Sequence, residues 1–528
     1  MKRLSLLFLL ICLVPQFVLA QGSPEEKGTG LVIDQAELDR MPRKMELSFT
    51  SYRGMPPSFS LEKYAPYAGD QGPYGTCMAW ATAYSAATII FAQSHGITDR
   101  EKITKAAFSP TYLFHNIVTT NDNCKSGANP GKAIEAMLLM GVPFIRTVPY
   151  TCGRSWTASA DAEAKLYRAL DFHLVFGTKK DPTDPSFKID ATKKALLENT
   201  PVIVGFDLPK SFHRITSDIW NPDPAEATGG WQHGKHAMTV IGYDDRKEGG
   251  AFLLLNSWGR TWGNNGTVWV RYKDFNIFCL LALQLFPNPS APVPDFIRDA
   301  PPPPKPAPTP QPAPAPVPKP QPAPTPQPAP APMPTFTLKG SVEFKLNTGT
   351  PMAASRVSTR NLVVEEDVVR KKTAGEDMVA YRMDKSYPSG TRFRFMINIS
   401  EQAYIYAFAT DLTGKVNRIL PYDDSISTLV GAKSIVAFPS DTKIVKMDDN
   451  KGTDYLLILY STEKLDAKTI AERMSATSGG LSQKIRAALG SKLISKGDVI
   501  YDNNAIGFSY NSKTRGGIVP LMVEISHE

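Results

Sequence analysis

A cysteine at the start of an apolar run is the first residue in this sequence that is suited to nucleophilic chemistry. Cys77 directly follows a segment that contains Gly72, Pro73 and Gly75. Because glycine and proline keep that approach non-helical, Cys77 falls in the first turn of a predicted helix over residues 77–93, where the helix dipole favours a thiolate. A thiol is a good nucleophile only when it is ionised, so this position suits an attacking sulfur.

Three further side chains complete a candidate reaction centre. His236 opens an apolar strand-like run and is the candidate base, whereas His233 lies in the polar segment before it and is the weaker alternative. Asn256 follows another strand-like run, and its amide oxygen can accept from an imidazole N–H and fix the tautomer. Gln71 lies six residues before Cys77. Its side-chain amide can donate to an oxyanion together with the Cys77 backbone N–H.

The segments that carry these residues resemble the three signature blocks of the papain family of cysteine peptidases, in the family's order. They are QGPYGTCMAW, HAMTVIGY and NSWGRTWGNNG. The resemblance covers about residues 56–286 and implies an α+β peptidase domain of two lobes, one helical and one β-barrel-like. It implies that Cys77 is the nucleophile, His236 the base, Asn256 the residue that orients the histidine, and Gln71 the oxyanion donor.

The resemblance also implies a substrate cleft and accounts for the other cysteines. Cys124 lies in a stretch similar to the family's Cys–Gly-rich cleft rim, and we expect a Cys124–Cys152 disulfide and a buried free thiol at Cys279. Trp258 matches the tryptophan that covers the histidine–asparagine pair. The substrate-binding residues that follow from the resemblance are Gly127, Gly205, Ala237 and Trp258.

The sequence departs from the family pattern in three respects. Met78 replaces the aromatic residue that usually follows the nucleophile, and Tyr74 stands where many members have a disulfide cysteine. His236 follows Cys77 by 159 residues, more than the about 130–150 that is usual in the family. The polar stretches 177–186 and 212–230 are the expected insertions. These departures leave open an inactive relative that acts as a binding or adhesion module through its C-terminal domain.

The chain divides into five predicted parts. They are a signal peptide (1–20), an N-terminal extension (21–55), the peptidase domain (56–286), a proline-rich linker (287–334) and a C-terminal domain (335–528). A positive start, an apolar stretch and small residues at the cleavage position characterise the signal. We therefore expect an exported protein, secreted or periplasmic, with no transmembrane segment.

The linker contains about half of the chain's 45 prolines, and the sequence PAPTPQPAPAP occurs in it two times. Such a sequence forms polyproline II rather than a core, so we expect a spacer that separates the two domains without a packed interface. After it, residues 392–399, 403–409, 455–460 and 518–525 are typical of strands and residues 467–489 of one helix. These elements predict a mainly β domain, either a β-sandwich or a similar compact fold, with a faint resemblance to an uncharacterised bacterial extracytoplasmic β-domain.

Composition excludes several other classes of function. The formal net charge of +8 is mild for 528 residues, and no dense basic block with interleaved aromatics indicates nucleic acid. No His, Cys, Asp or Glu set repeats at zinc-ligand spacing, so we predict no metal and no cofactor. The expected partners are a polypeptide substrate and, for the C-terminal domain, the cell envelope or another protein. The predicted activity is that of a cysteine endopeptidase.

Overall fold

The computed structural model describes six stretches of the chain. They are residues 27–45, 54–227, 234–298, 336–358, 378–439 and 444–528. The predicted signal peptide, most of the proline-rich linker and His233 lie outside these residues.

A long helical rod carries Cys77 into the helical lobe of the peptidase domain. It begins as α2 (Cys77–Ala79), continues as the π-helical stretch η2 (Trp80–Ala87) and ends as α3 (Thr88–Ser94), so the predicted helix is confirmed. Its alanines are small enough for neighbouring elements to approach closely, and the rod is almost completely buried. The other helices of this lobe are α4 (Arg100–Lys105), α5 (Pro110–Ile117), α6 (Pro130–Leu139) and α7 (Ala158–Ala164).

The second lobe of the peptidase domain is a strongly buried antiparallel sheet. Its strand order is β2-β7-β3-β4-β5-β6, and the short β1 pairs with β4. Helices α8 (Ser186–Leu197), α9 (Lys210–His213) and α10 (Tyr272–Phe278) belong to this lobe. The strands are β1 (Ser58–Ser60), β2 (Asp171–Phe176), β3 (Val202–Leu208), β4 (Gly234–Asp244), β5 (Ala251–Leu255), β6 (Thr267–Arg271) and β7 (Cys279–Phe286).

The C-terminal domain is a sandwich of two sheets, which is one of the two alternatives expected from its strand-like segments. One sheet has the order β10-β11-β21-β18-β13-β14 with β15 on β13, and the other β16-β12-β8-β20-β19 with β9 and β17 at its margins. Their inner faces share one apolar core. The strands are β8 (Phe336–Leu346), β9 (Pro351–Met352), β10 (Ala354–Ser358), β11 (Val379–Met383), β12 (Arg392–Ile399), β13 (Ala403–Thr410), β14 (Asn417–Leu420), β15 (Leu429–Val430), β16 (Ser434–Phe438), β17 (Val445–Lys446), β18 (Gly452–Ser461), β19 (Val499–Tyr501), β20 (Ile506–Ser512) and β21 (Ile518–His527).

The helical part of this domain differs from the prediction of one helix over 467–489. Two helices, α11 (Ala467–Ala476) and α12 (Leu481–Leu489), pack against one another and cover the outer face of the first sheet. The chain breaks between them at Gly479, whose φ of 100° belongs to the left-handed region that favours glycine. The break turns the second helix back, so that both can bury apolar residues on the sheet.

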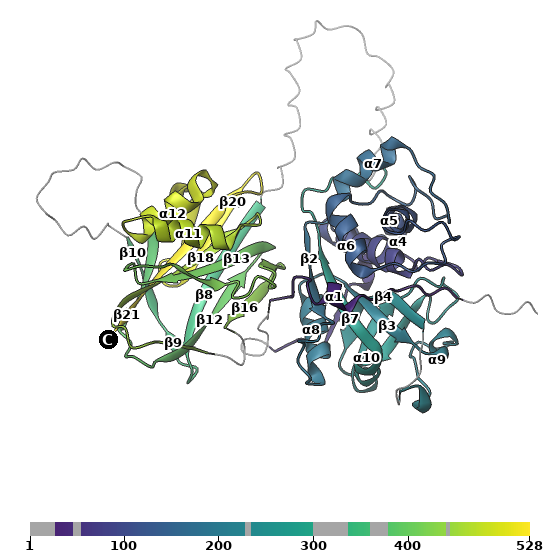
Figure 1. The fold of residues 1–528 in the computed structure, drawn as a ribbon, viewed down its shortest axis with the longest axis horizontal. Coiled ribbons are helices and arrows are strands. Elements are labelled where there is room, and N and C mark those ends of the chain that lie inside the picture. Colours follow the sequence, from purple (N-terminus) through teal and green to yellow (C-terminus); the bar gives the residue numbers. More distant parts are fainter. Residues whose placement is uncertain (1–26, 46–53, 228–233, 299–335, 359–377, 440–443) are drawn as a thin grey trace, which may run out of the picture.

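The two domains lie side by side and make a packed interface (Figure 1), contrary to the expectation of a pure spacer. Phe286 at the end of β7 is fully buried within an apolar cluster of the C-terminal domain. The Tyr404 hydroxyl donates a hydrogen bond to the Asp171 carboxylate of β2 at 3.2 Å, and the Lys464 ammonium forms an ion pair with the same carboxylate at 3.2 Å. The expectation was wrong because the composition of a linker does not determine whether the domains on its two sides pack against each other.

Candidate active site

The loop before Cys77 is held in place by a neighbouring disulfide-linked region. Cys124 and Cys152 form a disulfide, the pairing expected from the sequence. The Gly75 N–H donates to the backbone oxygen of Cys124 at 2.7 Å, and the Tyr150 hydroxyl donates to the backbone oxygen of Gln71 at 2.8 Å. Both ends of the loop that precedes Cys77 are therefore fixed by the same covalently closed region.

His236 lies on the buried strand β4, beside the rod that carries Cys77. The Thr239 hydroxyl donates to the backbone oxygen of Ala81 at 3.1 Å, which ties the strand to the rod. Cys77 and Ala237, the residue after His236, lie in the same buried apolar cluster. The structure thus brings together the nucleophile and base candidates, although they come from different lobes.

Asn256 determines which nitrogen of His236 carries the proton. Its Oδ1 lies 2.7 Å from Nε2 of His236 and also accepts from the Ser257 N–H at 2.8 Å. The bond from the Ser257 N–H identifies this atom as the amide oxygen, which can only accept hydrogen bonds. Nε2 of His236 is therefore the ring nitrogen that carries the proton. Nδ1 of His236 is buried and has no hydrogen-bond partner among the described residues. It is therefore left as a proton acceptor.

Burial keeps the candidate nucleophile and base uncharged. It raises the pKa of the Cys77 thiol to about 12, and backbone N–H groups oppose this only in part. It also lowers the pKa of His236 to about 4, although the hydrogen bond that His236 donates to Asn256 opposes this shift. At neutral pH both groups are neutral, because neither charged form is solvated in this arrangement.

The Gln71 side chain is fully buried and uses both ends of its amide. Its Oε1 accepts from the Ser257 hydroxyl at 2.6 Å. Its Nε2 donates to the backbone oxygen of Tyr74 at 2.7 Å and to that of Gly28 at 3.1 Å. The Gly28 oxygen also accepts from Trp258 Nε1 at 3.0 Å. A carbonyl oxygen of the chain itself thus occupies an acceptor position in front of the predicted oxyanion donor.

This carbonyl belongs to an N-terminal segment, residues 27–45, which crosses the peptidase domain toward the C-terminal domain and is purple in Figure 1. Its residues 28–32 lie between the two lobes, in what we call the interlobe site. The Gly30 and Leu31 N–H groups donate to the backbone oxygen of Lys235 in the β-lobe at 3.1 and 3.0 Å. On the helical-lobe side, Val32 donates to Ala128 at 3.1 Å and Ala128 donates to Gly30 at 2.7 Å. Residues 28–32 therefore cover the candidate reaction centre with hydrogen bonds to both lobes.

Three of the four predicted substrate-binding residues contact this segment, and the fourth, Ala237, lies in the same apolar cluster as Cys77. A β-carbon on Gly127 would lie 2.2 Å from the Gly30 oxygen, and one on Gly205 would lie 2.6 Å from a methyl carbon of Leu31. The lack of side chains at these two glycines makes room for the segment. Trp258 donates to the backbone oxygen of Gly28, and Ala237 belongs to the buried apolar cluster that contains Cys77.

Sequence reasoning missed two parts of this site. Residues 28–32 carry no catalytic residue type, and only Gly28, Gly30 and Leu31 hint at a close approach. No pattern in the sequence singles out His213. Its half-buried ring stacks on Trp258 at 4.7 Å between centroids, the distance at which His236 also meets Trp258. The tryptophan therefore contacts two imidazoles.

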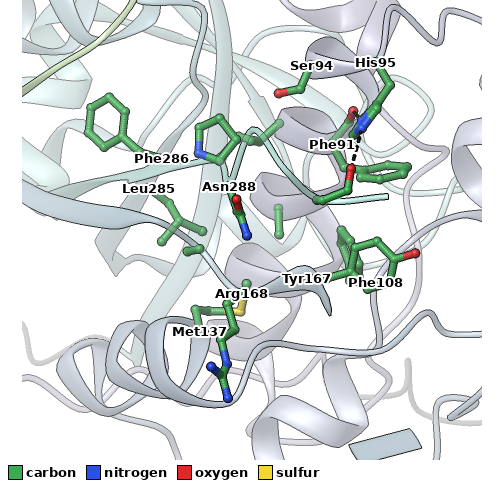
Figure 2. Close-up of a pocket in the computed structure, with 15 residues that line it drawn as sticks. Phe91, Ser94, His95, Phe108, Met137, Tyr167, Arg168, Leu285, Phe286 and Asn288 are labelled. Carbon is green, nitrogen blue, oxygen red and sulfur yellow. Dashed lines mark hydrogen bonds between the residues drawn. The ribbon is translucent and has the colours of Figure 1, made fainter. Parts of the chain in front are cut away.

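A small apolar cavity of about 40 Å³ lies between the helical lobe and residues 285–291, at the end of β7 and just after it, away from the catalytic candidates (Figure 2). Phe91, Phe108 and Met137 line it. His95 also lines it, and its Nδ1 lies 2.8 Å from the backbone oxygen of Phe91. Neither Cys77 nor His236 contributes to it. Within the described residues, no group of His, Cys, Asp and Glu is arranged to hold a metal ion, and none of the helices described has both the length and the apolar character needed to cross a bilayer.

Comparisons with known proteins define the class of the first domain. Residues 61–284 match the family model of the papain family cysteine proteases, and residues 386–464 match a domain of unknown function, DUF4384. Residues 61–284 therefore belong to the papain family of cysteine proteases. The predicted fold class is confirmed, with helices and a sheet in this domain and a mainly β domain after it.

The individual relatives have low sequence identity to this chain and align with only part of it. An uncharacterized peptidase C1-like protein of Acanthamoeba polyphaga mimivirus is 26% identical over 213 residues, which is 39% of this chain and 64% of the viral protein. Cathepsin B-like CP2 of Giardia intestinalis is 26% identical over 233 residues, or 42% of this chain and 70% of that protein. The chain thus spans less than two thirds of the first of these relatives. Among solved structures, xylellain of Xylella fastidiosa is 22% identical, with a TM-score of 0.39, over 50% of this chain and 97% of that one.

Proposed function

We propose that this chain is an exported, papain-type cysteine endopeptidase in which Cys77 is the nucleophile and His236 the base. The observation that carries the proposal is the Nε2–Oδ1 contact of 2.7 Å between His236 and Asn256. It fixes the tautomer in which Nδ1 can accept the thiol proton. The burial of Cys77 and Ala237 in one apolar cluster supports the same pairing of β4 with the start of the helical rod.

The proposed reaction proceeds through an acyl-thioester. Nδ1 of His236 takes the proton of the Cys77 thiol, and the thiolate attacks the carbonyl carbon of the scissile bond. The Gln71 amide and the Cys77 backbone N–H stabilise the oxyanion. The imidazolium then gives its proton to the leaving amine, while Asn256 keeps the ring aligned. Water, deprotonated by His236, attacks the acyl carbon of the thioester. The C–S bond then breaks, the carboxylic acid is released, and the imidazolium returns its proton to the Cys77 thiolate.

Endopeptidase activity is supported by the way residues 28–32 lie in the interlobe site. One end of this stretch is hydrogen-bonded to Gln71 and Trp258, and the other end to Ala128. A polypeptide can therefore pass along the site on both sides of the candidate nucleophile. Because the chain's own residues occupy it, we propose that the protein is inactive until they are displaced.

The proposal is tested with a fluorogenic peptide and the variant Cys77→Ala. Displacing residues 28–32, as described below, should give an active enzyme, and the same displaced protein with Cys77→Ala should cleave nothing. A Cys279→Ala variant is the matched control, because Cys279 is the other free and buried thiol. Turnover that survives Cys77→Ala, or a displaced protein that binds peptides without cleaving them, would contradict the proposal. Export is tested separately, by fractionating producing cells and sequencing the N-terminus of the mature protein.

A further inference from the structure

The N-terminal segment does not end at the interlobe site but continues to the C-terminal domain, where Arg43 forms a β-bridge to each of the two domains. The Arg43 N–H donates to Ser425 at 2.6 Å, and Ser427 donates to the Arg43 oxygen at 2.8 Å. On the opposite side, Leu174 of β2 exchanges backbone hydrogen bonds of 2.7 and 2.8 Å with the residues that flank Arg43. The segment therefore joins the peptidase sheet to a loop of the C-terminal domain.

A buried ion pair reinforces this junction. The Lys44 ammonium pairs with Glu198, and the two side chains are 8% and 0% exposed. The other carboxylate oxygen of Glu198 accepts from the Gly431 N–H at 2.9 Å and from the Ser434 hydroxyl at 3.3 Å, both in the C-terminal domain. One carboxylate thus holds the N-terminal segment and the C-terminal domain together. Removal of one partner leaves a buried unpaired charge, which is strongly unfavourable.

The next residue is inserted into the C-terminal domain itself. Met45 is only 4% exposed and belongs to the apolar core between the two sheets of that domain. Between this anchor and the interlobe site, the short helix α1 (Gln35–Leu38) is fixed by a hydrogen bond of 2.8 Å from Gln35 to Gly177. Both ends of the segment are therefore bound, one at the candidate reaction centre and one in the C-terminal domain.

We propose that the C-terminal domain is a clamp that, by holding residues 42–45, keeps residues 28–32 in the interlobe site. Separation of the C-terminal domain from residues 42–45 would then free the segment and expose Cys77. This proposal rests on the proposed function, because exposure of Cys77 controls activity only if Cys77 is the nucleophile. The domain thus regulates access to the site without contributing a group to it.

The experiment measures the labelling rate of Cys77 by iodoacetamide in the full-length protein, using mass spectrometry of its peptides. Met45→Glu puts a charge in an apolar core and should release the segment, whereas Met45→Leu conserves the anchor and is the matched control. We expect Met45→Glu to label Cys77 at least about tenfold faster, since labelling follows the open fraction. Cys279 is free and buried, so its labelling reports global unfolding in the same sample.

A surface variant tests the clamp without disturbing a core. Asp423, 46% exposed, pairs with Arg43, so Asp423→Ala weakens the clamp. Lys464→Ala removes an ion pair of the domain interface that does not touch the segment. We expect Asp423→Ala to label Cys77 faster than Lys464→Ala does. Equal Cys77 labelling in Met45→Glu, Met45→Leu and the unaltered protein, or equal rates in the two surface variants, would overturn the clamp. Labelling needs no peptide turnover, so rapid labelling without cleavage would refute the proposed activity and leave the clamp standing.

Discussion

The backbone oxygen of Gly28 lies 3.1 Å from Nε2 of Gln71, the amide that the sequence assigns to the oxyanion. A substrate cannot use that donor while the carbonyl is there. The relationship also explains why Cys77 and His236 are fully buried, because the segment that carries Gly28 covers them. The predictions below follow from this closed arrangement.

Enlarging Gly28 should open the interlobe site. A β-carbon there would lie 2.1 Å from the Tyr74 backbone oxygen, which cannot move aside cheaply. Gly28→Ala should therefore raise Cys77 labelling by at least about tenfold and switch on peptide cleavage. Gly153→Ala, where a β-carbon meets nothing within 4 Å, should leave both unchanged. Similar rates in the two variants would mean that residue 28 does not gate the site.

Acidification should loosen the closed state. Burial lowers the pKa of His236 to about 4 from an ordinary 6.5. Because the closed state holds His236 neutral, its stability is complete above pH 6.5. That stability is lost as the pH falls through 6.5 toward 4, where the open state takes up a proton and the closed state does not. Hydrogen exchange at the Leu31 and Val32 amides, corrected for intrinsic rates, should accelerate over that range, with amides of β21 as the reference. Protection that stays constant down to about pH 4 would contradict the prediction.

Opening should also change how the thiol titrates. With the segment in place, the pKa of Cys77 is raised to about 12, so labelling should climb without levelling throughout the neutral and mildly alkaline range. In Gly28→Ala the helix start and a nearby imidazolium should lower the pKa of Cys77. The rate should then level off at a lower pH than in the unaltered protein. Identical pH profiles in the two proteins would show that the segment does not control ionisation of the sulfur.

Loss of the oxyanion donor should slow an opened enzyme. In the Gly28→Ala background, Gln71→Ala should reduce kcat by about 10²–10³, with little change in KM, because the donor acts mainly in the transition state. Gln93→Ala, a glutamine on α3 outside the site, is the matched control. A loss of less than about threefold in kcat would assign oxyanion stabilisation to other groups.

The Cys124–Cys152 disulfide should stabilise the helical lobe. It closes a loop with a sequence separation of 28, and loops of this size correspond to about 3 kcal/mol of unfolding free energy. The double variant Cys124→Ser/Cys152→Ser should lose about that amount in denaturant titrations. Mass spectrometry of unreduced peptides checks the bond itself, and two free thiols in the purified protein would contradict it.

The candidate site was accessible from the sequence because its residues lie in compact blocks with local structural signals. Gly72 and Gly75 mark the non-helical approach to Cys77, and the apolar runs around His236 and Asn256 have the length of strands. The arrangement of residues 28–32 carries no such signal. These residues adopt their conformation from hydrogen bonds to Ala128 and Lys235, about 100 and 200 residues further along the chain.

The domain interface and the break between α11 and α12 were missed for different physical reasons. Glu198 and Lys44 look like ordinary exposed charges in sequence, and only the fold makes them a buried pair. The break at Gly479 was marked by two adjacent glycines, but the apolar spacing on both sides continues a helical period. Here the backbone preference of glycine outweighed that periodicity.

The position of the clamp has a consequence for the order of events during synthesis. Residues 28–45 leave the ribosome long before the C-terminal domain, because the hydrogen-bond partners of Arg43 at Ser425 and Ser427 are made almost four hundred residues later. A nascent peptidase domain can therefore fold around its own N-terminus before the clamp exists. A chain that terminates early, before residue 425, would carry a complete candidate site whose cover is held by the peptidase domain alone.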